Sequence, residues 1–103
     1  MLYRAAVRLR MIVSFRDRYT EGFWRHGTGK TMPANLRRVA MGKLKLLSDA
    51  AVLEDLRVPP GNHLEELKGD RAGQHSIRIS RRYRVCFAWR EGNAREVEVV
   101  DYR

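Results

Sequence analysis

Apolar and polar residues alternate one by one through the C-terminal part of the chain, residues 74–103. The apolar positions of three successive stretches are Ile77 and Ile79, then Tyr83, Val85, Phe87 and Trp89, then Val97 and Val99. Alternation with a period of two is typical of β-strands that place one face on a core. The intervening segments 80–82 and 91–93 are short enough to be hairpin connections. The pattern therefore predicts a three-stranded antiparallel meander.

Earlier in the chain the spacing of apolar residues becomes helical. Five of them recur at intervals of three and four: Leu36, Val39, Ala40, Leu44 and Leu47. This spacing predicts an amphipathic helix over 33–48, with Pro33 in its first turn and one or two more turns reaching residue 56. We also expect short strands at 11–15 and 63–67, a helical or irregular stretch at 16–24, a break at 57–62 and a charged loop at 68–73. The predicted fold class is α+β.

Charge narrows the range of partners. The chain has 103 residues, enough for one domain, and its 21 Lys and Arg against 12 Asp and Glu give a net charge of +9. Such an excess attracts polyanions, and nucleic acid is the leading candidate. An acidic protein partner, or a basic surface with no specific ligand, is the alternative. Residues 1–10 form a basic leader, and the second methionine, Met11, is expected to open the domain 11–103.

Some classes of site are excluded by residue type and spacing. Cys86 is the single cysteine, so the chain has no internal disulfide and no site built on several thiolates. It is expected to be a buried, inert thiol. The segment 26–30 lacks the spacing of a phosphate-binding loop and predicts a turn with His26 on the surface. No apolar run has the length of a membrane span or the form of a signal peptide, which suggests a cytoplasmic protein.

Three blocks of sequence, 59–79, 83–89 and 97–102, resemble the HigB-type toxins of bacterial toxin-antitoxin modules. The blocks have the order and spacing of that family, which belongs to the RelE superfamily. The resemblance extends over nearly everything from Met11 onward. It implies a RelE-like fold, in which an N-terminal strand and one or two helices pack on a three- to four-stranded antiparallel sheet.

The resemblance also implies an activity and its partners. Members of the family are ribosome-dependent mRNA endonucleases that need no metal and no cofactor: the ribose 2′-hydroxyl attacks the adjacent phosphate and the 5′-oxygen leaves. The implied partners are a HigA-like helix-turn-helix antitoxin, the 70S ribosome and mRNA. Operator DNA is expected to be bound only through the antitoxin, and no membrane is involved.

Several residues match the family's functional positions. Arg84 and Lys68 would stabilise the charge on the phosphorane. Tyr102 would stack on a base or donate its hydroxyl, and Asp101 would orient a neighbour or accept a proton. A less specific contact with phosphates is expected from Arg71, Arg78 and Arg82. The alternatives are solvated charges, surface ion pairs and, for Tyr102, packing against the edge of the sheet.

The chain departs from the family pattern at two positions. Many relatives end in Asp-Tyr-His, whereas this chain ends in Arg103, which stays protonated and is a poor proton shuttle. Some relatives have a histidine where this chain has Glu65. Glu65 can serve as the base, His63 or His75 can replace it, or the reaction can proceed by charge stabilisation with weak proton transfer. His75 is expected to be packed. A weakly active or inactive binding module within an antitoxin complex at its own promoter is therefore the second hypothesis.

Overall fold

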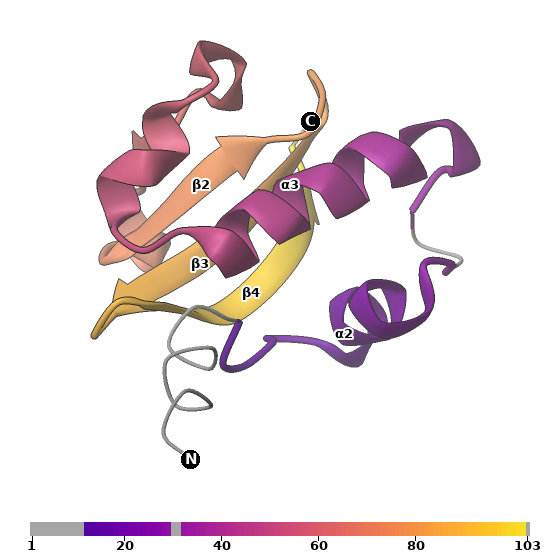
Figure 1. Ribbon diagram of the computed structural model, residues 1–103, viewed down its shortest axis with the longest axis horizontal. Helices are drawn as coiled ribbons and strands as arrows, with labels where there is room; N and C mark the ends of the chain where they lie inside the picture. Colours follow the sequence, from indigo (N-terminus) through magenta and orange to yellow (C-terminus); the bar gives the residue numbers. More distant parts are fainter. Residues whose placement is uncertain (1–11, 30–31, 103) are drawn as a thin grey trace.

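The computed structural model of the protein describes residues 12–29 and 32–102. A four-stranded antiparallel sheet has the order β1-β2-β3-β4, with strands Glu65–Glu66, Gln74–Arg78, Tyr83–Arg90 and Asn93–Asp101. Helix α3 (Arg37–Asp49) crosses one face of this sheet, and α2 (Arg18–His26) lies beside β4 (Figure 1). The α+β class, the meander and the antiparallel sheet under two helices are confirmed. The leader 1–10 and Met11 lie outside the described residues.

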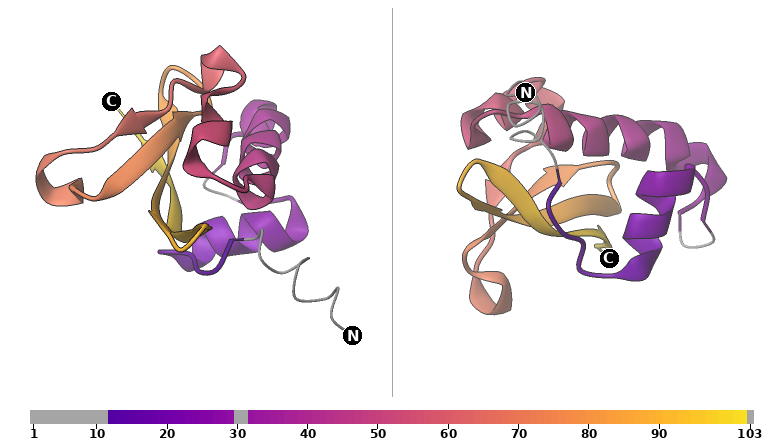
Figure 2. Two further views of the ribbon diagram at one scale, coloured as in Figure 1. Left: turned by 60° about the vertical axis from the view of Figure 1, so that its left-hand side comes forward. Right: turned by 60° about the horizontal axis from the view of Figure 1, so that its bottom comes forward.

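The hydrophobic core lies between α3 and the sheet. Its fully buried side chains include Ala40, Leu44 and Leu47 from the helix and Ile77, Val85, Phe87 and Val97 from the strands. These are the residues at which the helical and the two-residue periods predict inward positions, so packing follows the hydrophobic pattern. The other face of the sheet is turned away from α3 (Figure 2). We call it the open face.

Register determines which side chains share the open face. Ser76 lies opposite Cys86, and Cys86 lies opposite Glu98. Arg84 lies opposite Val100, and on the other side opposite Arg78. Neighbours in register project to the same side of a sheet. The open face thus has polar and charged side chains at positions that alternate with the core residues.

A β-bulge in β4 adjusts this register. The pairing with β3 shifts between Cys86 and Ala88, and Glu96 has a φ of 53° at the irregularity. The extra residue lets Ala94 and Val97 both face the core although they are three apart in sequence. It also returns Glu98 to the open face.

The first predicted strand is only partly correct. Within residues 12–15 the chain forms two isolated parallel bridges, Ile12 with Ala94 and Phe15 with Val97, and no continuous strand. The bridges flank β4 at its bulge, where the irregular backbone of β4 interrupts a regular ladder.

The stretch 16–24, predicted as helical or irregular, contains most of α2. Asp17 caps this helix, because its carboxylate accepts a hydrogen bond of 2.6 Å from the backbone N–H of Thr20. Gly27 ends it with a φ of 78°, a conformation that glycine adopts without strain. His26 is exposed, as expected.

The main helix begins four residues later than predicted and ends at Asp49, next to the predicted end at residue 48. A 3-10 turn, Ala34–Leu36, follows Pro33, and α3 begins at Arg37 and ends at Asp49. The expected continuation to residue 56 is wrong, since the chain is extended at Ala50 and a separate 3-10 helix, Leu53–Arg57, follows. Asp55 explains the break: its carboxylate accepts hydrogen bonds from the backbone N–H groups of Ala51 and Val52 and starts a new turn.

The segment before the meander is held by a buried asparagine. Asn62 has no exposed surface; it donates to the Leu56 carbonyl at 3.1 Å and accepts from Lys43 Nζ at 2.6 Å. The predicted break at 57–62 thus includes a fixed 3-10 turn, Pro60–Asn62. The strand predicted at 63–67 is reduced to β1, Glu65–Glu66, and the loop 68–73 contains one 3-10 turn, Gly69–Arg71.

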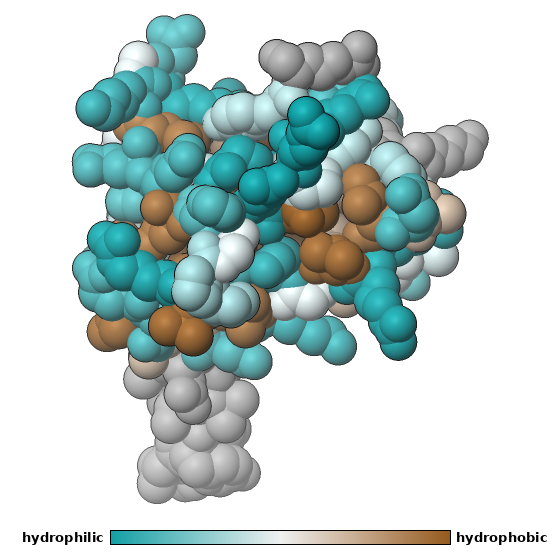
Figure 3. All heavy atoms as spheres, turned by 90° about the horizontal axis from the view of Figure 1, so that it is seen from above, coloured by the Kyte–Doolittle hydropathy of each residue, from teal (hydrophilic) through white to brown (hydrophobic). Residues whose placement is uncertain are grey.

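The face of the molecule that is seen from above is mainly hydrophilic (Figure 3). Seen from above, hydrophilic side chains surround small hydrophobic patches (Figure 3). None of the helices within residues 12–29 and 32–102 is long and apolar enough to cross a membrane.

Candidate functional site

Arg84 is the best-held charged side chain of the open face. Its Nε donates to Ser76 Oγ at 2.8 Å, and its Nη2 donates to the backbone carbonyl of His63 at 2.6 Å. Its side chain is only 11% exposed, and its Nη2 lies 3.7 Å from Glu65 Oε1. Two hydrogen bonds and an ion pair fix the plane of the guanidinium. The side chain therefore loses part of its conformational entropy on folding, and less is lost when a ligand binds.

Glu65 is the carboxylate that the fold brings to Arg84. It comes from β1, opposite Ser76 in β2, and its side chain is 58% exposed. A carboxylate that is solvent-accessible and next to a fixed cation can accept a proton from a bound hydroxyl. Lys68 follows two residues after β1 and is exposed at the start of the 3-10 turn Gly69–Arg71.

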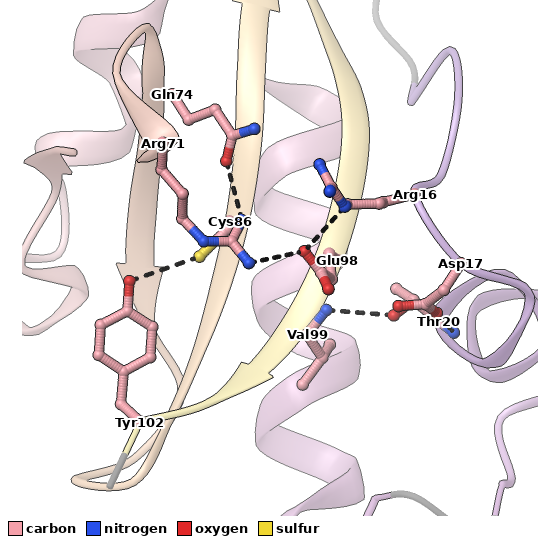
Figure 4. A network of polar contacts seen from close by, with 9 residues as sticks. All are labelled: Arg16, Asp17, Thr20, Arg71, Gln74, Cys86, Glu98, Val99 and Tyr102. Atoms are coloured by element: carbon pink, nitrogen blue, oxygen red, sulfur yellow. Dashed lines mark hydrogen bonds and ion pairs between the residues drawn. The ribbon is translucent and has the colours of Figure 1, made fainter. Parts of the chain in front are cut away.

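Arg71 lies in a second polar cluster of the open face (Figure 4). Its Nη1 donates to Gln74 Oε1 at 3.0 Å and its Nη2 to Glu98 Oε1 at 3.1 Å. Arg16 Nε approaches the same Glu98 oxygen at 3.7 Å. Desolvation lowers the pKa of Arg71, but the hydrogen bond and the negative charge of Glu98 outweigh it, so the pKa is raised. The guanidinium is therefore a permanent cation.

Tyr102 extends the cluster beyond the end of β4. Its hydroxyl lies 3.8 Å from the sulfur of Cys86, and 39% of the residue is exposed. Desolvation, followed by the contact with Cys86, raises the pKa of Tyr102, so the phenol stays protonated at neutral pH. The ring of Tyr102 is thus held at one end while part of it faces solvent.

Cys86 is fully buried, which confirms the expected buried thiol. Burial raises the pKa of the thiol, and the hydrogen bond with Tyr102 only partly offsets this.

Because the thiolate is the nucleophile, we expect iodoacetamide at pH 7.5 to alkylate Cys86 at least tenfold more slowly in the folded protein than in 6 M guanidinium chloride. Mass spectrometry of the alkylated protein measures both rates. Equal rates would show that the thiol is accessible in solution.

Asp101 is not brought to Arg84. It lies opposite Tyr83 on the core side of the sheet, and Arg82 binds its two carboxylate oxygens at 2.7 and 2.8 Å. It also lines a cavity of about 200 Å³ beside α2 whose walls include Thr20, Phe23, Met32 and Val99. Asp101 and Tyr102 therefore point to opposite faces, as successive strand residues do.

The remaining candidates occupy different places. Arg78 is half-buried, opposite Arg84 in β2. Arg82 is exposed, with its guanidinium 5.4 Å from the centre of the Tyr83 ring. His75 stacks on Phe87 on the core side, with ring centres 6.2 Å apart, so the expected packed histidine is confirmed. Arg103 lies outside the described residues.

Ser76 and Glu98 contribute to the open face but were not singled out by sequence reasoning, and His63, considered there as a replacement base, contributes through its backbone instead. Ser76 and Glu98 occupy polar positions of the alternation, which predicts their face but not their partners. His63 contributes a backbone carbonyl, with a φ of 45°, and no side-chain pattern predicts that. Among residues 12–29 and 32–102, no three His, Cys, Asp or Glu side chains gather as a metal site would require.

Together the open face offers fixed cations, a carboxylate and a protonated phenol within one surface. Arg84 and Arg71 can bind and stabilise negative charge on a phosphate. Glu65 can take a proton, and Tyr102 can donate a hydrogen bond or stack on a planar group. This set of groups suits chemistry at a phosphodiester.

Comparison with known proteins identifies the family of the chain. The chain is 36% identical to Toxin HigB-1 of Vibrio cholerae serotype O1 over 88 residues, which cover 82% of this chain and 90% of that toxin. It is 38% identical to an uncharacterized protein of Haemophilus influenzae over 76 residues, covering 73% of this chain and 75% of that protein. The family model for the RelE-like toxins of the type II toxin-antitoxin system HigB matches residues 13–103 of this chain. The chain belongs to this family of HigB-like toxins.

Proposed function

We propose that this toxin is an endoribonuclease that cleaves mRNA on the ribosome, with the open face as its active site. The observation that carries the proposal is Arg84, whose guanidinium is fixed by Ser76 and the His63 carbonyl beside the carboxylate of Glu65. Because these three partners compensate for the burial of Arg84, its cation is held at one position, where it can bind a phosphate. The net charge of +9 favours a polyanionic substrate.

In the proposed reaction, the ribose 2′-hydroxyl attacks the adjacent phosphorus. Glu65 takes the proton of the 2′-hydroxyl as the new P–O bond forms. Arg84 and Lys68 stabilise the added negative charge on the phosphorane oxygens. The bond from phosphorus to the 5′-oxygen then breaks, and the protonated hydroxyl of Tyr102 supplies the proton to the leaving oxygen. The products are a 2′,3′-cyclic phosphate and a 5′-hydroxyl.

The test is expression of the toxin without its antitoxin. We expect growth arrest and new 5′ ends within translated messages, mapped by primer extension. Purified toxin should cut mRNA bound to 70S ribosomes and leave the same RNA intact without ribosomes. Growth at the normal rate with intact transcripts would contradict the proposal.

As a toxin of a type II system, the protein has an antitoxin as its partner. We propose that this antitoxin is of the HigA kind, with a helix-turn-helix domain, and that operator DNA is bound only through it. The site of action is then the cytoplasm, where ribosomes and mRNA are found. A short helix-turn-helix reading frame next to the toxin gene would support this partner, and co-purification of its product with the toxin tests it.

A weakly active binding module is the second candidate function. Two observations favour it: Asp101 is bound by Arg82 on the face away from Arg84, and residue 103 is an arginine, which is a poor proton shuttle. In this case the toxin would act mainly within an antitoxin complex that binds its own promoter.

Arg103→His distinguishes the two candidates. A histidine titrates near neutral pH and can transfer a proton, whereas arginine cannot. If Arg103 leaves the native active face without a proton-transfer group, we expect the substitution to increase the cleavage rate on ribosomes by at least about tenfold. Single-turnover rates at pH 6 to 8 measure this, with Arg103→Lys as the control. If the native protein cleaves mRNA and Arg103→His is no faster, the result would support the active toxin, with Glu65 and Tyr102 in the proton-transfer roles.

A further inference from the structure

Glu98 is an unexpected residue for a surface that binds RNA. Its carboxylate lies on the open face next to Cys86, and only 20% of its side chain is exposed. A carboxylate at this place repels phosphate and loses solvation when it is buried. No step of the proposed reaction uses it. Its contacts therefore have to explain its position.

Glu98 binds two arginines that come from distant parts of the sequence. One carboxylate oxygen accepts from Arg71 Nη2 at 3.1 Å and lies 3.7 Å from Arg16 Nε. Arg71 ends the 3-10 turn of the loop 68–73, and Arg16 directly precedes Asp17, the cap of α2. Figure 4 shows both guanidinium groups reaching across the strand to the same carboxylate.

The contact of Arg71 fixes the loop that includes Lys68. The 3-10 turn itself has two backbone bonds, from Arg71 N–H to the Lys68 carbonyl at 3.3 Å and from Ala72 N–H to the Gly69 carbonyl at 3.0 Å, and Leu67 N–H donates to the Gln74 carbonyl at 2.8 Å at the base of the loop. Gly69, the first residue of the turn, and Gly73, two residues after its end, have φ values of 66° and 92° and add no side-chain packing to the loop. The bonds from Arg71 to Gln74 and Glu98 connect the turn to β2 and β4.

We propose that Glu98 is a positioning residue of the active face: it anchors Arg71 and thereby holds the loop 68–73, with Lys68, over the reacting phosphate. This inference rests on the proposed function, because the loop matters only if phosphate is bound there. The carboxylate lowers the positive charge of the face, but it also fixes the positions of two cations, Arg71 and Arg16. The role predicts opposite effects on substrate binding and on turnover.

The first test is Glu98→Gln with ribosome-bound mRNA. The amide keeps the shape and its oxygen can still accept from Arg71, but the bond loses the charge of the carboxylate, and one repulsive charge is removed from the face. We expect kcat to fall about tenfold because Lys68 is less well positioned, while KM stays the same or decreases. Partial unfolding of the variant would also lower the apparent kcat and leave KM unchanged, but it would come with a lower Tm. Tm is therefore measured on the same samples.

Glu96→Gln is the matched control. It makes the same charge change in the same strand, and within the part of the chain that the structure describes Glu96 makes no salt bridge. Its kcat should stay within about twofold of the native value. An equal fall in kcat for both variants would overturn the proposal, since the effect would then come from charge alone.

A double-mutant cycle identifies the partner. If Glu98 acts through Arg71, the variant with both Arg71→Ala and Glu98→Gln should have the kcat of Arg71→Ala alone. Multiplicative losses in the double variant would mean that the two residues act independently, which contradicts the proposal.

Hydrogen exchange tests the anchor without any nuclease assay. In Glu98→Gln the amides of Arg71 and Ala72 should exchange about tenfold faster than in the native protein, with the amides of β3 unchanged. Unchanged exchange in the loop overturns the anchor even if the native toxin cleaves mRNA. Faster exchange in a chain that never cleaves would leave the anchor in place and reject the proposed function instead.

Discussion

Replacement of Arg84 by alanine is expected to reduce the rate of mRNA cleavage on the ribosome by about 10²- to 10³-fold, the usual loss when one fixed donor to a developing anion is removed. Arg84 is the cation with the most contacts on the open face, through Ser76, the His63 carbonyl and Glu65. Alanine removes the charge at the phosphate and also releases Glu65 from its ion pair. Single-turnover cleavage of ribosome-bound mRNA measures the loss.

Two variants separate charge from position. Arg84→Lys keeps a cation but cannot bond Ser76 and the His63 carbonyl in the same plane, so we expect it to recover only part of the rate. Arg90→Ala is the matched control, because Arg90 is an exposed arginine at the end of the same strand. The proposed role of Arg84 is wrong if Arg84→Ala and Arg90→Ala have similar rates at native-like Tm.

The strands could be predicted because their periodicity is a local property. Val85 and Phe87 face the core and Arg84 and Cys86 face away, as the alternation indicated. The bulge at Glu96 could not be predicted, since it depends on how β4 meets β3 and the segment 12–15. The end of α3 depends on the bonds of Asp55 to two backbone N–H groups, for which helical spacing gives no signal.

The residue types of the candidate site could be predicted from the sequence. Which of these residues share a face of the sheet, and which partners they contact, was harder to predict. The resemblance selected Arg84, Glu65 and Tyr102, which the fold brings to one face. It also selected Asp101, yet two adjacent strand residues cannot face the same side. The ion pair of Arg71 with Glu98 joins residues 27 positions apart, and only the folded sheet brings them together.

Replacement of Phe87 by alanine is the change with the largest expected effect on stability. Phe87 has no exposed surface, stacks on His75 and meets the edge of Trp89 at a centre-to-centre distance of 6.5 Å. Removing a buried phenyl ring costs roughly 3–5 kcal/mol of unfolding free energy, because the lost contacts leave a cavity that a β-sheet fills poorly.

Domains of this size have a total stability of about 5–15 kcal/mol, so Phe87→Ala should remove roughly a fifth or more of it. Thermal unfolding should show a Tm that is lower by about 4–8 °C for each kcal/mol lost. Val39→Ala is the control: Val39 is 43% exposed on α3, and its loss should change the free energy of unfolding by less than about 0.5 kcal/mol. Similar Tm values for the two variants would mean that the core is not centred on β3. The expected difference follows from burial alone, and it should appear whether or not the protein cleaves RNA.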